Sequence, residues 1–147
     1  MRFWTWRREG LLDEIEGFDL AAAGAKTCAM LREILIGKLH RVTVTAVEPE
    51  YPGSLTVDPE WLEQAGILPY EKVQVLNCNN GYRLETYAIV GKPGQGELIV
   101  NGAAARHALP GDRVIVCAFG QCTEAEARAA KPHVLVFDEK NRLVEKH

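Results

Sequence analysis

The sequence predicts a mainly β protein, a compact β-barrel with short helical inserts. Several short runs alternate apolar and polar residues and are rich in β-branched side chains, which is the pattern of half-buried strands. Clusters of Pro, Gly and Asn separate these runs, and the helical patterns between them are short. A chain of 147 residues has the size of one domain and can bury a sizeable core.

The first half of this pattern begins with LHRVTVTAV at 39–47, which predicts a strand. The stretch EPEYPGS at 48–54 contains two prolines and a glycine and predicts a turn, followed by a short strand at 54–57. Asp58 is predicted to cap a helix, because a proline stands at the first helical position after it, and Gly66 is predicted to end that helix.

The second half contains a predicted hairpin. The runs KVQVLNC at 72–78 and YRLETYAIV at 82–90 flank Asn79-Asn80-Gly81, and an Asn-Gly pair tolerates the positive φ of a tight turn. The remaining predicted elements are a turn at 91–96, a strand at 97–100, a loop opening into a short helix at 101–107, a strand at 113–119, a helix capped by Thr123 and ending near Ala130, a strand at 133–137 and a last short strand through Leu143.

Residues 1–29 differ in character from the rest of the chain. They hold two of the three tryptophans, several charges and an alanine-rich stretch, whereas from Met30 onward the chain has the pattern of a folded domain. We expect residues 1–29 to be an N-terminal extension outside the fold, Met30 to be the natural start, and residues 30–147 to form a single domain.

Composition and charge argue against several classes of protein. The net charge of −3 provides no basic field to attract nucleic acid. No apolar run reaches the roughly 20 residues that span a bilayer, and acidic residues interrupt the place where a signal peptide would be apolar, so we expect a cytoplasmic protein with no membrane partner. No cysteine pair has CxxC spacing and the four histidines form no recognisable ligand set, so we expect free thiols and no metal site.

Ser54 is the only serine in the chain, and it follows Gly53 in the predicted turn. A serine hydroxyl can attack the carbonyl of the preceding residue and turn the peptide bond into an ester, and glycine at that position lets the hydroxyl approach. Elimination and hydrolysis would then leave a pyruvoyl group, whose ketone forms a Schiff base with a substrate amine. The alternative interpretation is that Gly-Ser is simply a good turn.

Six stretches from this chain occur together, in the same order, in one enzyme family. They are GKLHRVTVT (37–45), EYPGS (50–54), AGIL (65–68), GYRLETYAI (81–89), VNGAAA (100–105) and GDRVIV (111–116). On these motifs, which cover nearly all of residues 31–130, the sequence resembles the pyruvoyl-dependent aspartate 1-decarboxylases. The resemblance implies a six-stranded double-psi β-barrel, a homotetramer with sites between subunits, and a pyruvoyl cofactor derived from Ser54.

The resemblance also implies the catalytic and processing residues. Ser54 becomes the pyruvoyl group, and Tyr87 is the proton donor to the α-carbon after decarboxylation. Cleavage between Gly53 and Ser54 involves Thr86, whose hydroxyl stabilises the oxyanion and later contacts the substrate, and Tyr51 beside the cut. Taken alone, Thr86 would be an ordinary β-forming residue and Tyr87 a core or interface tyrosine.

Three basic side chains are implied in substrate binding. Arg83 resembles the residue that holds a substrate carboxylate by a bidentate contact, and Lys38 and His40 resemble the pair that completes recognition of the dianion. One residue separates Lys38 from His40 in a strand, so both can point to the same side. Which carboxylate Arg83 and Lys38 each hold stays open, and without the family Arg83 and Lys38 would be solvated charges and His40 a partly buried imidazole.

The stretch NGAAA is implied as a second part of the substrate site. Asn101 would polarise the pyruvoyl carbonyl, and the backbone amides of Gly102, Ala103 and Ala104 would cradle the substrate. Taken alone, this stretch is a helix start with good helix formers.

The implied activity is the loss of the α-carboxylate from L-aspartate to give β-alanine for pantothenate and coenzyme A synthesis. Residues up to 53 would become a β-chain and residues 54–147 an α-chain. Two alternatives stay open: a non-enzymatic β-barrel that binds a small ligand or a protein, and an enzyme for a related amino acid. An uncut chain distinguishes the first alternative, and a panel of substrates distinguishes the second.

Overall fold

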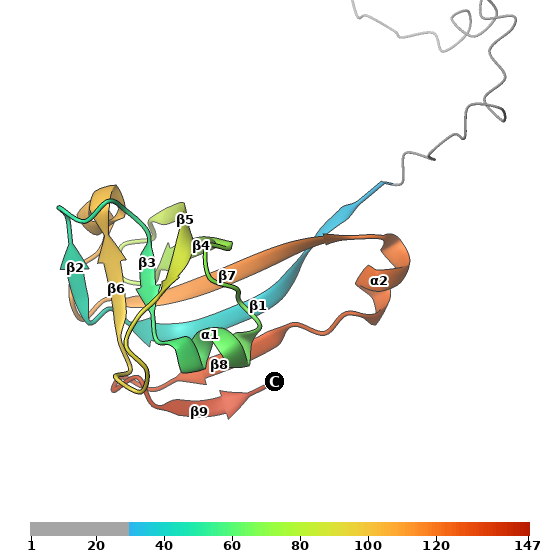
Figure 1. Ribbon diagram of the computed structural model, residues 1–147. Coiled ribbons are helices and arrows are strands. Elements are labelled where there is room, and N and C mark those ends of the chain that lie inside the picture. The colour runs from blue at the N-terminus through green and yellow to red at the C-terminus, as the bar shows by residue number, and fades with distance from the viewer. Residues whose placement is uncertain (1–29) are drawn as a thin grey trace, which may run out of the picture.

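The computed structural model describes residues 30–147, and the extension expected at residues 1–29 lies outside the described residues. The described part is mainly β, as predicted (Figure 1). Its elements are β1 (Arg32–Thr43), β2 (Ala46–Glu48), β3 (Leu55–Val57), α1 (Pro59–Ala65), β4 (Lys72–Asn77), β5 (Arg83–Val90), β6 (Leu98–Asn101), the 3₁₀ helix η1 (Gly102–His107), β7 (Arg113–Cys122), α2 (Glu124–Ala129), β8 (His133–Phe137) and β9 (Leu143–Lys146).

The strands form one mixed sheet in the order β2-β6-β3-β5-β4-β7-β1-β8-β9. Strands β1 and β2 are far apart in this order, yet only Val44 and Thr45 separate them along the chain. The N–H of Val44 donates to the carbonyl of Asp112 and the N–H of Thr45 to that of Leu98, both at 2.8 Å. The sheet therefore curls back on itself into a barrel-like arrangement, and β8 and β9 extend one edge (Figure 1).

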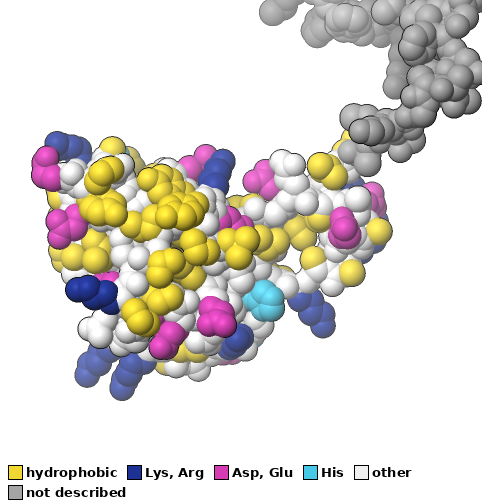
Figure 2. Space-filling model, viewed as in Figure 1, with side chains coloured by type: hydrophobic (Ala, Val, Ile, Leu, Met, Phe, Trp, Pro, Cys, Tyr) yellow, Lys and Arg dark blue, Asp and Glu magenta, His cyan; other side chains and the backbone are white. Residues whose placement is uncertain are grey.

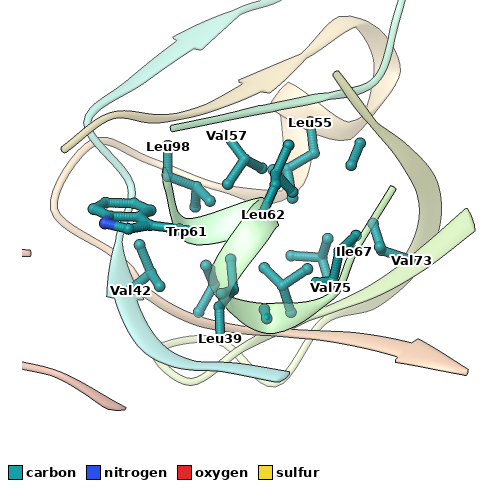
Figure 3. Close-up of a cluster of buried hydrophobic side chains, with 14 of the residues drawn as sticks. Leu39, Val42, Leu55, Val57, Trp61, Leu62, Ile67, Val73, Val75 and Leu98 are labelled. Atoms are coloured by element: carbon teal, nitrogen blue, oxygen red, sulfur yellow. The ribbon is translucent and has the colours of Figure 1, made fainter. Parts of the chain in front are cut away.

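Apolar side chains fill the inside of the curled sheet. On β1, Leu39 is fully buried between the more exposed Lys38 and His40, which is the alternation expected of a strand with one face on a core. Trp61 of α1 packs against Phe137 of β8 with ring centroids 4.7 Å apart, so the helix covers one side of the core. Figure 3 shows leucine and valine side chains from several strands converging on this helix.

Asp58 ties the start of α1 to the turn between β5 and β6. The side chain is 1% exposed. Its carboxylate accepts hydrogen bonds from the N–H groups of Glu60 at 3.0 Å, Gly96 at 2.8 Å and Gly94 at 3.3 Å. The predicted cap is confirmed, and the helix ends as predicted at Gly66, which has the left-handed φ of 67°.

One predicted strand begins earlier and is divided. β1 begins at Arg32 rather than at 39, because β7 runs on to Cys122 and pairs with Arg32 there. The sequence at 34–36 is continuously apolar and lacks alternation, which explains why the pattern did not indicate the earlier start. The strand predicted at 39–47 is interrupted after Thr43, where the chain bends from β1 into β2.

We expect Asp58→Ala to lower the free energy of unfolding by about 2–3 kcal/mol, because a helix cap is lost and the N–H groups of Gly94 and Gly96 lose a buried acceptor. Asp58→Asn keeps one acceptor oxygen and should lose less. Urea unfolding measures the free energy of unfolding of both variants. The measurement uses a Ser54→Ala background, in which every chain has the same covalent structure. An Asp58→Ala protein as stable as its parent would contradict this account of the cap.

Candidate active site

The peptide bond between Gly53 and Ser54 lies in a strained turn before β3. The φ angle is 114° at Gly53 and 92° at Ser54. Glycine adopts such angles readily, but a serine there costs roughly 1–3 kcal/mol. Two hydrogen bonds hold the turn: the N–H of Gly53 donates to the carbonyl of Tyr51 at 2.7 Å, and the N–H of Asn101 donates to the carbonyl of Ser54 at 3.0 Å.

The backbone of Gly102 lies directly against this turn. A Cβ at position 102 would stand 2.7 Å from the Cα of Gly53 and 2.9 Å from the carbonyl oxygen of Tyr51, which is closer than real Cβ contacts come. Gly102 also has a φ of 59°. Glycine is therefore required at position 102, and the start of η1 packs on the turn that carries the serine.

Ser54 and Asn101 are buried together, at 3% and 2% exposure. β3 and β6 are antiparallel, and Leu55 lies opposite Val100. Ser54 and Asn101 flank this pair, so they face each other. Nδ2 of Asn101 donates to Oγ of Ser54 at 3.3 Å and to Oγ1 of Thr56 at 2.8 Å. One buried amide group therefore contacts two hydroxyls, one just before β3 and one on it.

A cavity of about 340 Å³ opens beside Ser54. Tyr87 lines it, because the parallel pairing of Leu55 with Ala88 places Tyr87 of β5 beside Ser54, the residue that precedes β3. In Figure 2, hydrophobic side chains gather over β3 and β5. The residues that line the cavity are Tyr51, Pro52, Ser54, Pro69, Tyr70, Tyr87, Ile89 and Val90.

Lys38, His40 and Arg83 lie away from this cavity. Lys38 and His40 lie on β1, which is four strands from β3 in the order of the sheet, and neither side chain lines the cavity. Arg83 precedes Tyr87 by four positions on β5, which is roughly 13 Å along the strand. Within residues 30–147 the expected carboxylate-binding side chains therefore do not line the cavity beside Ser54.

The side chain of His40 lies instead in a cleft of about 560 Å³ that Arg41 and Arg113 also line. Burial lowers the pKa of His40, and the charges of Lys38, Arg41 and Arg113 lower it further. Its Nδ1 is buried and has no hydrogen-bond partner among residues 30–147. The imidazole is therefore neutral at neutral pH.

The other expected site residues divide into two groups. Gly102 contacts the turn that contains Gly53, whereas Ala103 is exposed and Ala104 packs against the core. Thr86 alternates with Tyr87 on β5, so its side chain faces the other side of the strand and is not among the residues that line the cavity in the described part of the chain.

Thr56 and Tyr70 belong to the site although no motif in the sequence pointed to them. Thr56 could have been predicted from the sequence, because residues two positions apart in extended chain point to the same side, and Thr56 stands two positions after Ser54. Tyr70 comes from the loop after α1, where its N–H donates to the carbonyl of Ala88 at 2.7 Å. Only this tertiary contact brings Tyr70 to the cavity.

Comparison with known proteins identifies the family. A sequence model described as aspartate decarboxylase matches residues 30–144. The chain belongs to the aspartate decarboxylase family. This match spans β1 to β8 and includes both sides of the Gly53–Ser54 bond.

Curated members of the aspartate decarboxylase family are similar over most of their length. The chain is 52% identical to aspartate 1-decarboxylase of Ruminiclostridium cellulolyticum over 113 residues, which are 77% of this chain and 88% of the relative. It is 52% identical to aspartate 1-decarboxylase 2 of Gloeobacter violaceus over 118 residues, 80% of this chain and 94% of the relative. For aspartate 1-decarboxylase of Listeria monocytogenes the identity is 49% over 114 residues, 78% and 90% of the two chains.

This aspartate decarboxylase family member carries free thiols at Cys78, Cys117 and Cys122, and Cys28 lies outside the described residues. Burial raises the pKa of the Cys117 thiol, and the charge of Lys38 opposes that rise.

Between residues 30 and 147, no three His, Cys, Asp or Glu side chains are grouped as a metal site requires. No helix in the same range is long and apolar enough to cross a membrane.

We expect acid to destabilise the folded protein through His40. Because its pKa is lowered in the folded state, the unfolded chain, with an ordinary histidine pKa near 6.5, takes up a proton first. Stability is therefore lost as the pH falls below about 6.5, until the folded imidazole is also protonated. His40→Gln should flatten this part of the profile when thermal unfolding is followed from about pH 8 to pH 5. Equal pH profiles for the wild type and His40→Gln would contradict the assignment of this acid effect to His40.

Proposed function

We propose that this member of the aspartate decarboxylase family is a cytoplasmic aspartate 1-decarboxylase that makes its own pyruvoyl group from Ser54. Its substrate is L-aspartate, which loses the α-carboxylate to give β-alanine for pantothenate and coenzyme A synthesis. One observation carries the proposal: the only serine of the chain is buried, strained and preceded by glycine, in a sequence 52% identical to an aspartate 1-decarboxylase.

Self-cleavage begins when Oγ of Ser54 attacks the carbonyl carbon of Gly53. The new C–O bond forms, the C–N bond breaks and the hydroxyl proton ends on the freed nitrogen, so an ester replaces the peptide bond. Loss of the Cα proton of Ser54 then expels the carboxylate of Gly53 and leaves dehydroalanine. Water replaces the nitrogen, which leaves as ammonia, and the α-chain of residues 54–147 begins with a ketone in place of an amine.

The strained turn favours the first of these steps. Breaking the Gly53–Ser54 bond releases the positive φ of Ser54, which is worth roughly 1–3 kcal/mol. The tight packing of Gly102 on Gly53 keeps the turn from relaxing before the bond is broken. The family resemblance supports Thr86 as the donor to the oxyanion of Gly53, although its side chain does not line the cavity beside Ser54 in the described residues. The carbonyl of Tyr51 holds the turn by accepting from the N–H of Gly53.

The surroundings of Ser54 fit a pyruvoyl group. Nδ2 of Asn101 lies 3.3 Å from Oγ of Ser54, so this amide can donate to a carbonyl oxygen formed beside it. The backbone amides of Gly102, Ala103 and Ala104 are proposed to hold the substrate next to it. When present, the pyruvoyl group supplies a ketone that condenses with the substrate amine and accepts the electrons left by carbon dioxide.

Tyr87 is proposed as the proton donor to the α-carbon of the substrate. Its ring lines the same cavity as Ser54 and is 41% exposed, so the hydroxyl reaches both the substrate and water. A phenol is a weak acid, which suits it to protonating a carbanion and then regaining a proton from solvent. Without this proton the decarboxylated substrate could not leave as β-alanine.

The carboxylate-binding residues are proposed to come from a second subunit. Lys38, His40 and Arg83 do not line the cavity of their own chain. A homotetramer would bring the outer sheet face of one chain to the cavity of the next. The exposed rings of Tyr51 and Tyr70 at the cavity, 49% and 78% accessible, support such a contact.

The barrel is proposed to be the six-stranded double-psi type, with residues 30–147 as one domain and residues 1–29 as an extension. Support comes from the parallel pairs β1–β8, β2–β6 and β3–β5, which a simple meander of antiparallel hairpins would not contain. The closure through Val44 and Thr45 gives further support.

We expect purified wild-type protein to give two bands in a denaturing gel, and Ser54→Ala to give one uncut, inactive chain. Thr123→Ala removes an exposed hydroxyl at the start of α2, far along the chain from the cut, and should cleave normally. An uncut wild type with no activity would favour the non-enzymatic barrel. Cleaved protein that prefers another amino acid to L-aspartate in a substrate panel would favour the related enzyme, and cleavage of Ser54→Ala would overturn the role of Ser54.

We expect Lys38→Ala and Tyr87→Phe to be cut normally and to decarboxylate poorly, yet to restore activity when co-expressed. In a randomly mixed oligomer, about one site in four receives both an intact Lys38 from one subunit and an intact Tyr87 from another. Decarboxylation by the mixed oligomer, compared with each variant alone, measures this. If the mixture is no more active than the single variants, all site residues come from one chain and the proposed assembly is wrong.

A further inference from the structure

We propose that Thr56 is a positioning residue for the maturation of Ser54. Its hydroxyl holds the Asn101 amide against Oγ of Ser54, so that this oxygen leaves readily with the carboxylate of Gly53. The inference rests on the proposed self-cleavage and assigns one of its steps to a residue outside the motif positions.

The amide of Asn101 is anchored more tightly by Thr56 than by Ser54. Its Nδ2 lies 2.8 Å from Oγ1 of Thr56 and 3.3 Å from Oγ of Ser54. An amide nitrogen has two hydrogens, so one can serve each hydroxyl. At 2% exposure, Asn101 has little access to water that could replace either hydroxyl.

Thr56 is itself held in one orientation. It lies on the middle strand of three, paired with Ile89 on β5 and with Ile99 on β6. A Cβ at position 91 would lie 3.0 Å from the γ-methyl group of Thr56. The absence of a side chain at Gly91 therefore leaves room for this methyl group. A β-branched side chain has few χ1 rotamers, and with the methyl against Gly91 the hydroxyl is directed toward Asn101.

The chemistry indicates which step this arrangement assists. While Ser54 attacks, negative charge develops on the carbonyl oxygen of Gly53. In the following elimination the Cα proton leaves, a double bond forms between Cα and Cβ, and the Cβ–Oγ bond breaks with its electrons going to Oγ. A donor fixed on Oγ stabilises that charge, so the Asn101 amide acts mainly on the elimination. An ester that does not eliminate persists, or is hydrolysed to leave a free serine at the new chain end.

The test compares Thr56→Val, which keeps the β-branched shape and lacks the hydroxyl, with Thr56→Ser, which keeps the hydroxyl. We expect elimination in Thr56→Val to slow about tenfold, the effect of losing one hydrogen bond. Full-length chains that contain the ester should then accumulate, and hydroxylamine should split them between residues 53 and 54. Mass spectrometry should show a larger share of α-chains that begin with serine. Thr56→Ser should mature at about the wild-type rate, as a positioning role through the hydroxyl requires.

Several outcomes would overturn the inference. Equal maturation of Thr56→Val and wild type would remove the role of Thr56. Full-length Thr56→Val that resists hydroxylamine would place the block before the ester and contradict the assigned step. If Thr56→Val does not fold, as thermal unfolding in a Ser54→Ala background would show, Thr56→Ala replaces it with the same expectation. Wild-type protein that never cleaves would instead refute the proposed function itself.

Discussion

The antiparallel pairing of β3 with β6 is the constraint on which the site depends. It sets Asn101 opposite Ser54, and it delivers Gly102 onto Gly53 as the chain leaves β6 for η1. Without this pairing, the turn before β3 could relax to ordinary backbone angles, and the amide of Asn101 would have no fixed relation to the serine.

Burial outweighs the strain in this part of the molecule. β3 is only three residues long, but Leu55 and Val57 are fully buried in the core and their backbones pair on both sides. Burying one such side chain stabilises by about 1.5–3 kcal/mol, which is similar to the roughly 1–3 kcal/mol cost of the positive φ at Ser54. The core therefore holds the strained bond in place.

Much of the fold could be predicted because its signals are local. The cap at Asp58, the end of α1 at Gly66 and the cap at Thr123 each follow from residue types that suit one backbone position, and all are confirmed. The early start of β1 at Arg32 could not be predicted, because its cause is the long-range pairing with Cys122 on β7.

The site divides in the same way. Ser54 stood out because it is unique and follows a glycine, both of which are properties of the sequence. The meeting of Ser54 with Tyr87 depends on the register of β3 against β5, and the separation of Lys38 from both depends on the strand order, so neither follows from a motif. The resemblance to a family names these residues, and the structure adds that Lys38 does not line the cavity beside Ser54 in its own chain.

The central claim is that a serine hydroxyl converts its own backbone into a ketone, and the mass of intact purified protein tests it most directly. The account predicts two fragments, one ending at Gly53 and one beginning at residue 54 whose mass is lower by one ammonia than that of a serine-started chain. A single unbroken chain, or a second fragment that retains the full mass of serine at its start, would contradict it.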